Sequence, residues 1–298
     1  MKKVILSLLF LGSLLNGGFS QVLSLVPHPL QHFQHPFNEK FIQRNQIQFI
    51  QVEISSKKEM DIIRAAHRFL VFEFNDDGRL ISEKKFKMGE IDTLNFAFEY
   101  NADGKMTLEQ EYIGSGILEK KYSYDENGNK KGIEYRKIDA FNDQSNLLSV
   151  DSIKTVILSD ATIIQTYYND YGRQYRDVRV YYDTLGYLTG YRETFILSHK
   201  QNSIEYSYND FGLLEEINYN FALNNKKRKE EYVYNDEGVP DTFLIYENGE
   251  LKERKEYLYN ADGSLKAILF KEMETNLIKI WQMTYIKKVE AGSEKLED

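Results

Sequence analysis

Three histidines near the start of the sequence are the first candidates for chemistry. His28, His32 and His35 are four and three residues apart, so a helix would place their imidazole rings on one face. Imidazole nitrogens grouped in this way can bind zinc or copper. Several prolines interrupt the same short stretch, and proline inside a helix removes a backbone hydrogen bond. We expect a flexible polar linker here, and metal binding by the three histidines stays open as an alternative.

Turns rich in asparagine, aspartate and glycine suggest a second chemistry, calcium binding. A calcium loop of the EF-hand type needs oxygen ligands at positions 1, 3 and 5, glycine at position 6 and glutamate at position 12. Glu99, Asn101, Asp103 and Gly104 satisfy the first four requirements, but the twelfth position is Gln110. Other turns of the chain do not keep the ligand set. We therefore predict turns without a bound metal.

Catalytic motifs are absent from the sequence. It contains no nucleophile elbow, phosphate-binding loop, dinucleotide fingerprint or HExxH stretch. Carboxylates are plentiful, but they lie in mixed-charge runs such as residues 252–256, which are typical of a solvated face. We predict that the protein is not an enzyme and needs no cofactor. A glycoside-active enzyme remains an alternative, because folding alone can bring two acids together.

Aromatic side chains are the remaining candidates for binding. The chain has 22 tyrosines and 18 phenylalanines but only one tryptophan. Aromatic faces stack against sugar rings and apolar groups, and they also form the core of a sheet. We favour the core for most of them. Tyr182, Tyr208 and Tyr234 precede regularly spaced turns, and we predict that these three bind a ligand.

An internal repeat explains where these aromatics lie. In each unit an aromatic residue precedes Asn or Asp, and glycine follows three residues after the Asn or Asp. This pattern favours a three-residue hairpin loop in which the glycine takes a positive φ. An apolar residue often stands two positions after the glycine. The structural turn glycines are Gly78, Gly104, Gly128, Gly172, Gly186, Gly212, Gly238 and Gly263.

The spacing of the glycines predicts the fold. Most steps are about 25 residues, which holds two strands and two turns. The short step from Gly172 to Gly186 holds one strand and places the turn at Gly172 on the opposite edge. We predict an all-β fold, a long antiparallel meander of about eighteen strands between Ile47 and Ile286. The aromatics before the turns should line one row of a twisted or curled open sheet, as a spiral or half-shell. Charged strands such as residues 229–234 argue against an outer-membrane barrel, whose outward face is apolar.

The repeat unit resembles the YD-repeat, or RHS-type, family. The best-matching segments are Phe72–Leu80, Tyr122–Gly128 and Tyr257–Leu265, and the resemblance covers roughly Phe69 to Tyr285. It implies an exported or surface-associated protein whose hairpins coil into a spiral or shell. It also implies links to carbohydrate binding and to the casing of large secreted toxins. Asn usually stands where the family favours Asp, and the chain resembles a short form without core segment or toxin tail.

The ends of the sequence predict export. Residues 1–20 show a basic start, an apolar run and small residues before Gln21, as in a cleaved signal peptide. We assign residues 21–45 to an N-terminal linker or helical segment, 46–290 to the repeat domain and 291–298 to a disordered tail. The formal net charge of −8 argues against nucleic acid as a partner, and the chain has no cysteine for disulfides.

Together these patterns predict an exported, non-enzymatic binding or scaffold protein. Its partner is expected to be a glycan or a cell-envelope or surface protein, in the periplasm or outside the cell. It should not span the membrane once the signal peptide is removed. A structural partner of a toxin, immunity-like or chaperone-like, is a further alternative.

Overall fold

The computed structural model describes residues 22–25, 27, 37–87, 93–139, 142, 144–159, 161–222 and 226–288. The predicted signal peptide, the three histidines at positions 28, 32 and 35, and the predicted C-terminal tail lie outside the described residues. No helix in the described part of the chain is long and apolar enough to cross a membrane. The elements are α1 (Glu39–Arg44), β1 (Ile47–Lys58), β2 (Arg64–Phe74), β3 (Leu80–Lys87), β4 (Thr93–Tyr100), β5 (Met106–Ile113), β6 (Gly116–Tyr124), β7 (Lys130–Asp139), β8 (Ser145–Ser159), β9 (Thr162–Tyr168), β10 (Gln174–Tyr182), β11 (Leu188–Phe195), β12 (Gln201–Tyr208), β13 (Leu214–Phe221), β14 (Lys226–Tyr234), β15 (Pro240–Glu247), β16 (Glu250–Tyr259), β17 (Leu265–Glu272) and β18 (Leu277–Lys287).

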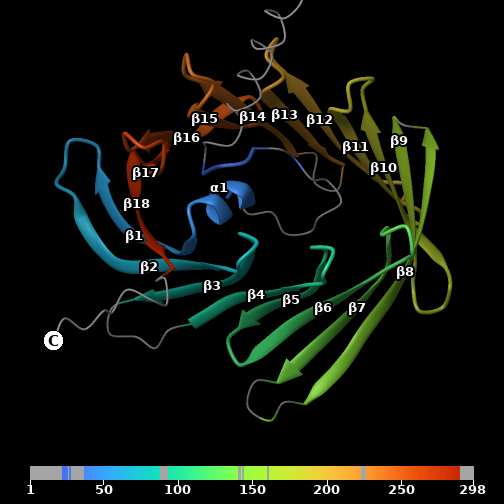
Figure 1. The fold of residues 1–298 in the computed structure, drawn as a ribbon. Helices are drawn as coiled ribbons and strands as arrows, with labels where there is room; N and C mark the ends of the chain where they lie inside the picture. Colours follow the sequence, from blue (N-terminus) through green and yellow to red (C-terminus); the bar gives the residue numbers. More distant parts are fainter. Residues whose placement is uncertain are drawn as a thin grey trace, which may run out of the picture.

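The strands form one antiparallel sheet that closes into a barrel (Figure 1). Each strand pairs with its neighbours in sequence, and β1 pairs with both β2 and β18. The prediction of an all-β meander of about eighteen strands is confirmed, since the sheet has eighteen. The prediction of an open sheet or half-shell is wrong. Closure pairs the two strands that would otherwise be edges, and it turns the aromatic face of the sheet inward.

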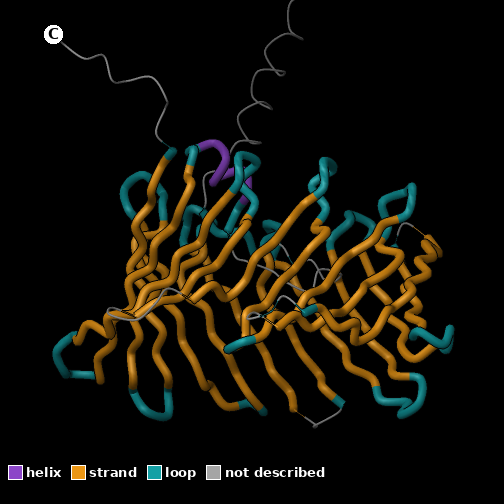
Figure 2. The backbone as a smooth tube through the Cα atoms, turned by 90° about the horizontal axis from the view of Figure 1, so that it is seen from below, coloured by secondary structure: helices purple, strands orange, loops and turns teal. Residues whose placement is uncertain are grey.

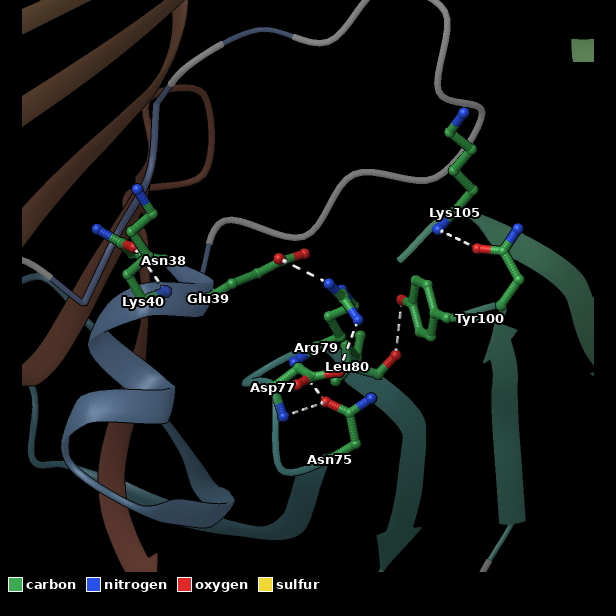
Figure 3. Close-up of polar contacts among 10 residues, drawn as sticks. Asn38, Glu39, Lys40, Asn75, Asp77, Arg79, Leu80, Tyr100 and Lys105 are labelled. Carbon is green, nitrogen blue, oxygen red and sulfur yellow. Dashed lines mark hydrogen bonds and ion pairs between the residues drawn. The ribbon is translucent and has the colours of Figure 1, made fainter. Parts of the chain in front are cut away.

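The turns have the predicted geometry. At all eight repeat glycines φ lies between +69° and +86°, the left-handed region that glycine adopts without steric cost. In the first turn the amide of Gly78 donates to the carbonyl of Asn75 at 3.0 Å. The Asn75 side chain accepts from the amides of Asp77 and Arg79, at 3.0 and 2.9 Å (Figure 3). The turns therefore fold on their own local hydrogen bonds.

The positions of the turns follow the predicted alternation. The turn at Gly172 joins β9 to β10, whereas the turn at Gly186 joins β10 to β11, so these two lie at opposite ends of the barrel. The other repeat turns share the end of Gly186, which is also the end where α1 lies (Figure 2). This end is called the helix end below, and the other is called the far end.

Helix α1 lies inside the barrel beside β1–β3 (Figure 1). The side chain of Asn38 caps it by accepting from the amides of Lys40 and Phe41, at 3.1 and 3.4 Å. Phe41 and Ile42 are buried in a core cluster with residues of β1, β2, β17 and β18. The ring of Phe37, just before the helix, lies 4.9 Å from that of Phe72. The sheet face that packs on this segment is the inner face.

Alternation along the strands assigns every other side chain to one face. Val52 and Leu70 oppose each other on the inner face, and the same face carries the second core cluster across β6–β11. The outer face carries the charged rows, for example Lys229 and Glu231 on β14. Aromatic side chains therefore line the interior, and mixed charges cover the outside.

Candidate functional site

The three tyrosines predicted to bind a ligand lie on the inner face near the helix end. Each pairs across its hairpin with the residue two positions after the turn glycine. Tyr182, Tyr208 and Tyr234 are all half-buried. Desolvation by burial raises the pKa of each phenol above its usual value. They stand in one row, as the repeat predicted.

Two of the three hydroxyls are engaged by the neighbouring hairpin. The Tyr208 hydroxyl donates to the carbonyl of Leu188 at 2.9 Å, and the Tyr234 hydroxyl donates to that of Leu214 at 2.5 Å. Each bond connects a strand to the first residue of the strand before it, which is the closing strand of the preceding hairpin. Figure 3 shows the equivalent bond between Tyr100 and the carbonyl of Leu80. The same bond is made by Tyr100, Tyr124, Tyr259 and Tyr285.

One aromatic residue of the repeat departs from the row. Tyr168 precedes the turn at Gly172, and it pairs with Ser152 at the far end. Its neighbour Tyr167 is the one that joins the inner cluster. Tyr168 therefore lies on the outer face, and the prediction that all eight aromatics line one row is wrong. Only one strand separates the turn at Gly172 from the turn at Gly186, so the turn at Gly172 lies at the far end. There the residue directly before the Asn, Tyr168, points outward and the residue before it, Tyr167, points inward.

Carboxylates are buried among the inner tyrosines. Glu109, Asp151 and Glu230 are only 5 or 6% exposed. Two phenol hydroxyls donate to Asp151, at 2.7 and 3.3 Å, and two donate to Glu230, both at 3.2 Å. Glu109 accepts from Tyr122 and from Lys120, both at 2.6 Å. These bonds offset the cost of burying charge and hold the rings in place.

The described side chains do not form a metal-binding cluster. Among the described residues no group of three or more histidine, aspartate or glutamate side chains could hold a metal ion. The Asx-rich turns use their side-chain oxygens on backbone amides instead, as Asn209 does with the amides of Phe211 and Leu213.

The outer face carries a groove at the far end of the barrel, with a volume of about 410 Å³. Its wall is a grid of outward side chains on β12–β15. Along one row Glu205 opposes Asn218, Asn218 opposes Lys229, and Lys229 opposes Tyr246. The groove is lined by Ser203, Glu205, Asn218, Tyr219, Asn220, Lys227, Arg228, Lys229, Tyr246 and Gly249.

One end of the groove is rigidly organised. The Lys229 ammonium lies 4.8 Å from the centre of the Tyr246 ring and pairs with Glu216 and Glu231. The Tyr246 hydroxyl donates to Glu231 at 3.0 Å. The hydrogen bond from Lys229 holds the pKa of the Glu231 carboxyl below its usual value. A tyrosine ring in fixed orientation therefore borders the groove.

Four other groove side chains are free to bind. Ser203, Glu205, Asn220 and Lys227 make no side-chain hydrogen bond or ion pair with any described residue. Together they offer hydroxyl, carboxylate, amide and ammonium groups. A side-chain carbon added at Gly249 would meet no atom within 4 Å, so the loop leaves this edge open.

Sequence reasoning missed this groove because its residues belong to runs that are typical of a solvated face. The signal that could have found them is polar alternation on adjacent strands. Asn218 and Asn220 are two residues apart, as are Lys227 and Lys229 on the next strand, so they form facing pairs.

Comparisons with known proteins leave the family of this chain undetermined. No family model matches the chain, and no curated protein matches it. TcdB2-TccC3 without its hypervariable C-terminal region is similar at 15% identity, over 74% of this chain and 14% of that chain, with a TM-score of 0.32. A porin-like protein from Bacteroides uniformis is similar at 10% identity, over 81% and 97% of the two chains, with a TM-score of 0.37. One from Bacteroides vulgatus is 14% identical over 67% and 95%, with a TM-score of 0.28. Likeness this weak carries no argument about function.

Proposed function

We propose that this chain is an exported, non-enzymatic binding and scaffold protein whose ligand is a glycan held in the outer groove. The four unengaged polar side chains of Ser203, Glu205, Asn220 and Lys227, close to the fixed ring of Tyr246, are the observation that carries the proposal. Export, to the periplasm or the outside, rests on the signal-like residues 1–20.

The chemistry of the groove suits sugar hydroxyls. Each hydroxyl both donates and accepts, and the amide of Asn220 does the same. The NH2 group of Asn218 donates to Glu216, and its carbonyl oxygen and second N–H are left for a ligand. Glu205 accepts only and Lys227 donates only, so the groove can fix the direction of individual hydroxyls. Tyr246 supplies apolar surface for the C–H face of a ring.

The size of the groove suits a short oligosaccharide. Neighbouring strands lie about 4.8 Å apart, so the four strands β12–β15 span roughly 14 Å between the outermost side-chain rows. The barrel holds this row rigid, because each of the four strands is paired on both sides. Little conformational entropy is then lost on binding.

A glycan array with the mature protein tests the proposal directly. The double variant Asn218→Ala/Asn220→Ala should weaken binding of the captured glycan by about tenfold or more, since each lost hydrogen bond contributes about 1 kcal/mol. Tyr246→Phe should retain most of the affinity, whereas Tyr246→Ala should lose it. Calorimetric titration measures both.

The matched control is Gln282→Ala, which removes an exposed amide from the outer face of β18. Its affinity should equal that of the wild type. Groove variants that bind the glycan as tightly as the wild type would contradict the assignment. A pull-down from the envelope, run beside the array, tests the alternative that the partner is an envelope or surface protein.

A further inference from the structure

The hairpin that joins β1 to β2 exposes three large apolar side chains at its tip. Met60 is 99% exposed, Ile62 is 71% exposed and Ile63 is 60% exposed. Residues 59–63 are called the β1–β2 tip below. Burial of large apolar side chains is the main driving force of folding, so three mostly exposed neighbours contribute little to the stability of this fold.

The tip projects beyond the barrel wall on one side. Among the described residues, β2 pairs with β3 only from Arg68 onward, whereas Arg64 and Ala65 pair with β1 alone. On the other side the tip leans on the loop between β17 and β18, where the amide of Glu59 donates to the carbonyl of Asn276 at 3.1 Å. The apolar side chains thus stand at the far end on a supported, two-stranded extension.

The backbone conformation of the tip also lowers the stability of the fold. Met60 has φ +67°, a region that a non-glycine residue adopts at an energetic cost. At two other loops of the far end the positive φ falls on Asn248 and Asn276, which tolerate it better. Met60 is thus an apolar side chain left in solvent and a non-glycine residue with positive φ, and its side chain is not buried against any described residue. Such departures are typical of functional positions.

Residues 57–64 hold three basic and two acidic side chains, although the chain as a whole is acidic. Asp61 pairs with Arg64 at 3.1 Å, and Glu59 pairs with Lys271 at 2.9 Å. The ammonium groups of Lys57 and Lys58 have no ion-pair partner among the described residues. Two uncompensated cations therefore lie at the base of an apolar tip.

We propose that the β1–β2 tip inserts into the headgroup region of an anionic lipid surface. The apolar side chains would enter the boundary between headgroups and acyl chains, and the two lysines would contact lipid phosphates. The tip lacks the aromatic and arginine anchors that dominate protein–protein interfaces, and its flexible aliphatic groups suit a fluid partner.

Other hairpins at the far end also expose apolar side chains, as expected if this end of the barrel faces the lipid. The β5–β6, β7–β8, β9–β10 and β11–β12 connections each carry an exposed apolar residue in or beside the turn. These are Ile113, Leu147, Leu148, Tyr171 and Leu197. At the helix end, Leu185 and Phe211 are exposed in two turns, and Val156, Ile157 and Leu158 are exposed on β8 beside the β8–β9 turn. The far end, which carries the projecting β1–β2 tip, would face the lipid.

Co-sedimentation of the mature protein with vesicles tests the proposal. The wild type should bind vesicles of phosphatidylcholine mixed with phosphatidylglycerol more tightly than vesicles of phosphatidylcholine alone, and salt should weaken that binding. The triple variant Met60→Ser/Ile62→Ser/Ile63→Ser should bind at least about tenfold more weakly. Lys57→Gln/Lys58→Gln should abolish the preference for anionic vesicles.

Two controls separate this result from other causes. Leu185→Ser/Phe211→Ser, at the helix end, should bind vesicles as the wild type does. The single variant Met60→Ser changes a side chain with almost no contacts, so it should keep the melting temperature and still weaken binding.

A wild type that does not sediment with either vesicle, or a triple variant that binds like the wild type, would overturn the proposal. The groove variant Asn218→Ala/Asn220→Ala should bind vesicles normally, so a failure of glycan binding is distinguishable.

Discussion

At the residue scale, a single hydroxyl explains why tyrosine rather than phenylalanine dominates the repeat. The position before the turn needs an aromatic ring for the inner face and an O–H for the carbonyl of the preceding hairpin. Tyr208 meets both needs through Leu188, and Tyr285 makes the same bond on β18 without a turn motif after it. Phe74, in the first unit, fills the ring position only and packs on Phe37.

The hydroxyl should have a measurable effect on stability. We expect Tyr208→Phe to lower the free energy of unfolding by about 1 kcal/mol, because the buried carbonyl of Leu188 loses its donor. Tyr208→Ala should cost about 3 kcal/mol or more, because a cavity is added. Urea unfolding checks both values. The control Tyr171→Phe alters a ring that is 86% exposed and should be neutral, so equal effects at positions 171 and 208 would contradict the account.

At the scale of elements, substitutions at two turn glycines distinguish the energetic cost of backbone strain from the cost of a steric clash. A Cβ at Gly172 would meet no atom within 4 Å, but φ is +69° there. A Cβ at Gly78 would lie 2.1 Å from the carbonyl oxygen of Glu39, in α1. Gly172→Ala should therefore cost about 1 kcal/mol from strain alone. Gly78→Ala should cost clearly more, because it also displaces the helix from the turn.

Thermal unfolding of the two glycine variants measures the difference. Tryptophan fluorescence adds a local signal, because the partly buried Trp281 packs against the core cluster that contains the helix. It should change for Gly78→Ala and stay constant for Gly172→Ala. Equal melting temperatures for the two variants would show that α1 does not pack on the turn as described.

Local signals explain how much of these elements the sequence could predict. Asx–Gly spacing is a short-range pattern, so it correctly located the turns and the alternation at Gly172. β1 and β18 carry no such pattern, and their pairing joins the two ends of the sheet, so closure could not be predicted. The groove was missed for a related reason: Glu205 and Tyr246 meet only across four strands, and each alone is typical of a solvated surface.

At the scale of the whole molecule, the seam between β1 and β18 holds the barrel closed. Val52 is fully buried there, between Leu70 on β2 and Met283 on β18. We expect Val52→Asp to cost several kcal/mol, because it buries an unpaired carboxyl among apolar groups. Hydrogen exchange should then show amides of β2 and β18 losing protection together, although they belong to opposite ends of the sheet.

The outward substitution Glu53→Gln is the control for the seam, since Glu53 is exposed on the other face. Its exchange pattern should match that of the wild type. If β18 kept full protection in Val52→Asp, the two ends of the meander would be independent and the sheet would be open at this point.

Closure also sets the order in which the chain can fold. The seam pairs Ile47 with Lys287, so it cannot form before almost the entire sheet is in place. Pairings between such distant segments slow folding, and until they form the backbone groups along both seam strands are unsatisfied. During that interval β1 of one molecule can pair with β18 of another as readily as with its own. Refolding yield should therefore fall as protein concentration rises, with strand-exchanged dimers as the competing product.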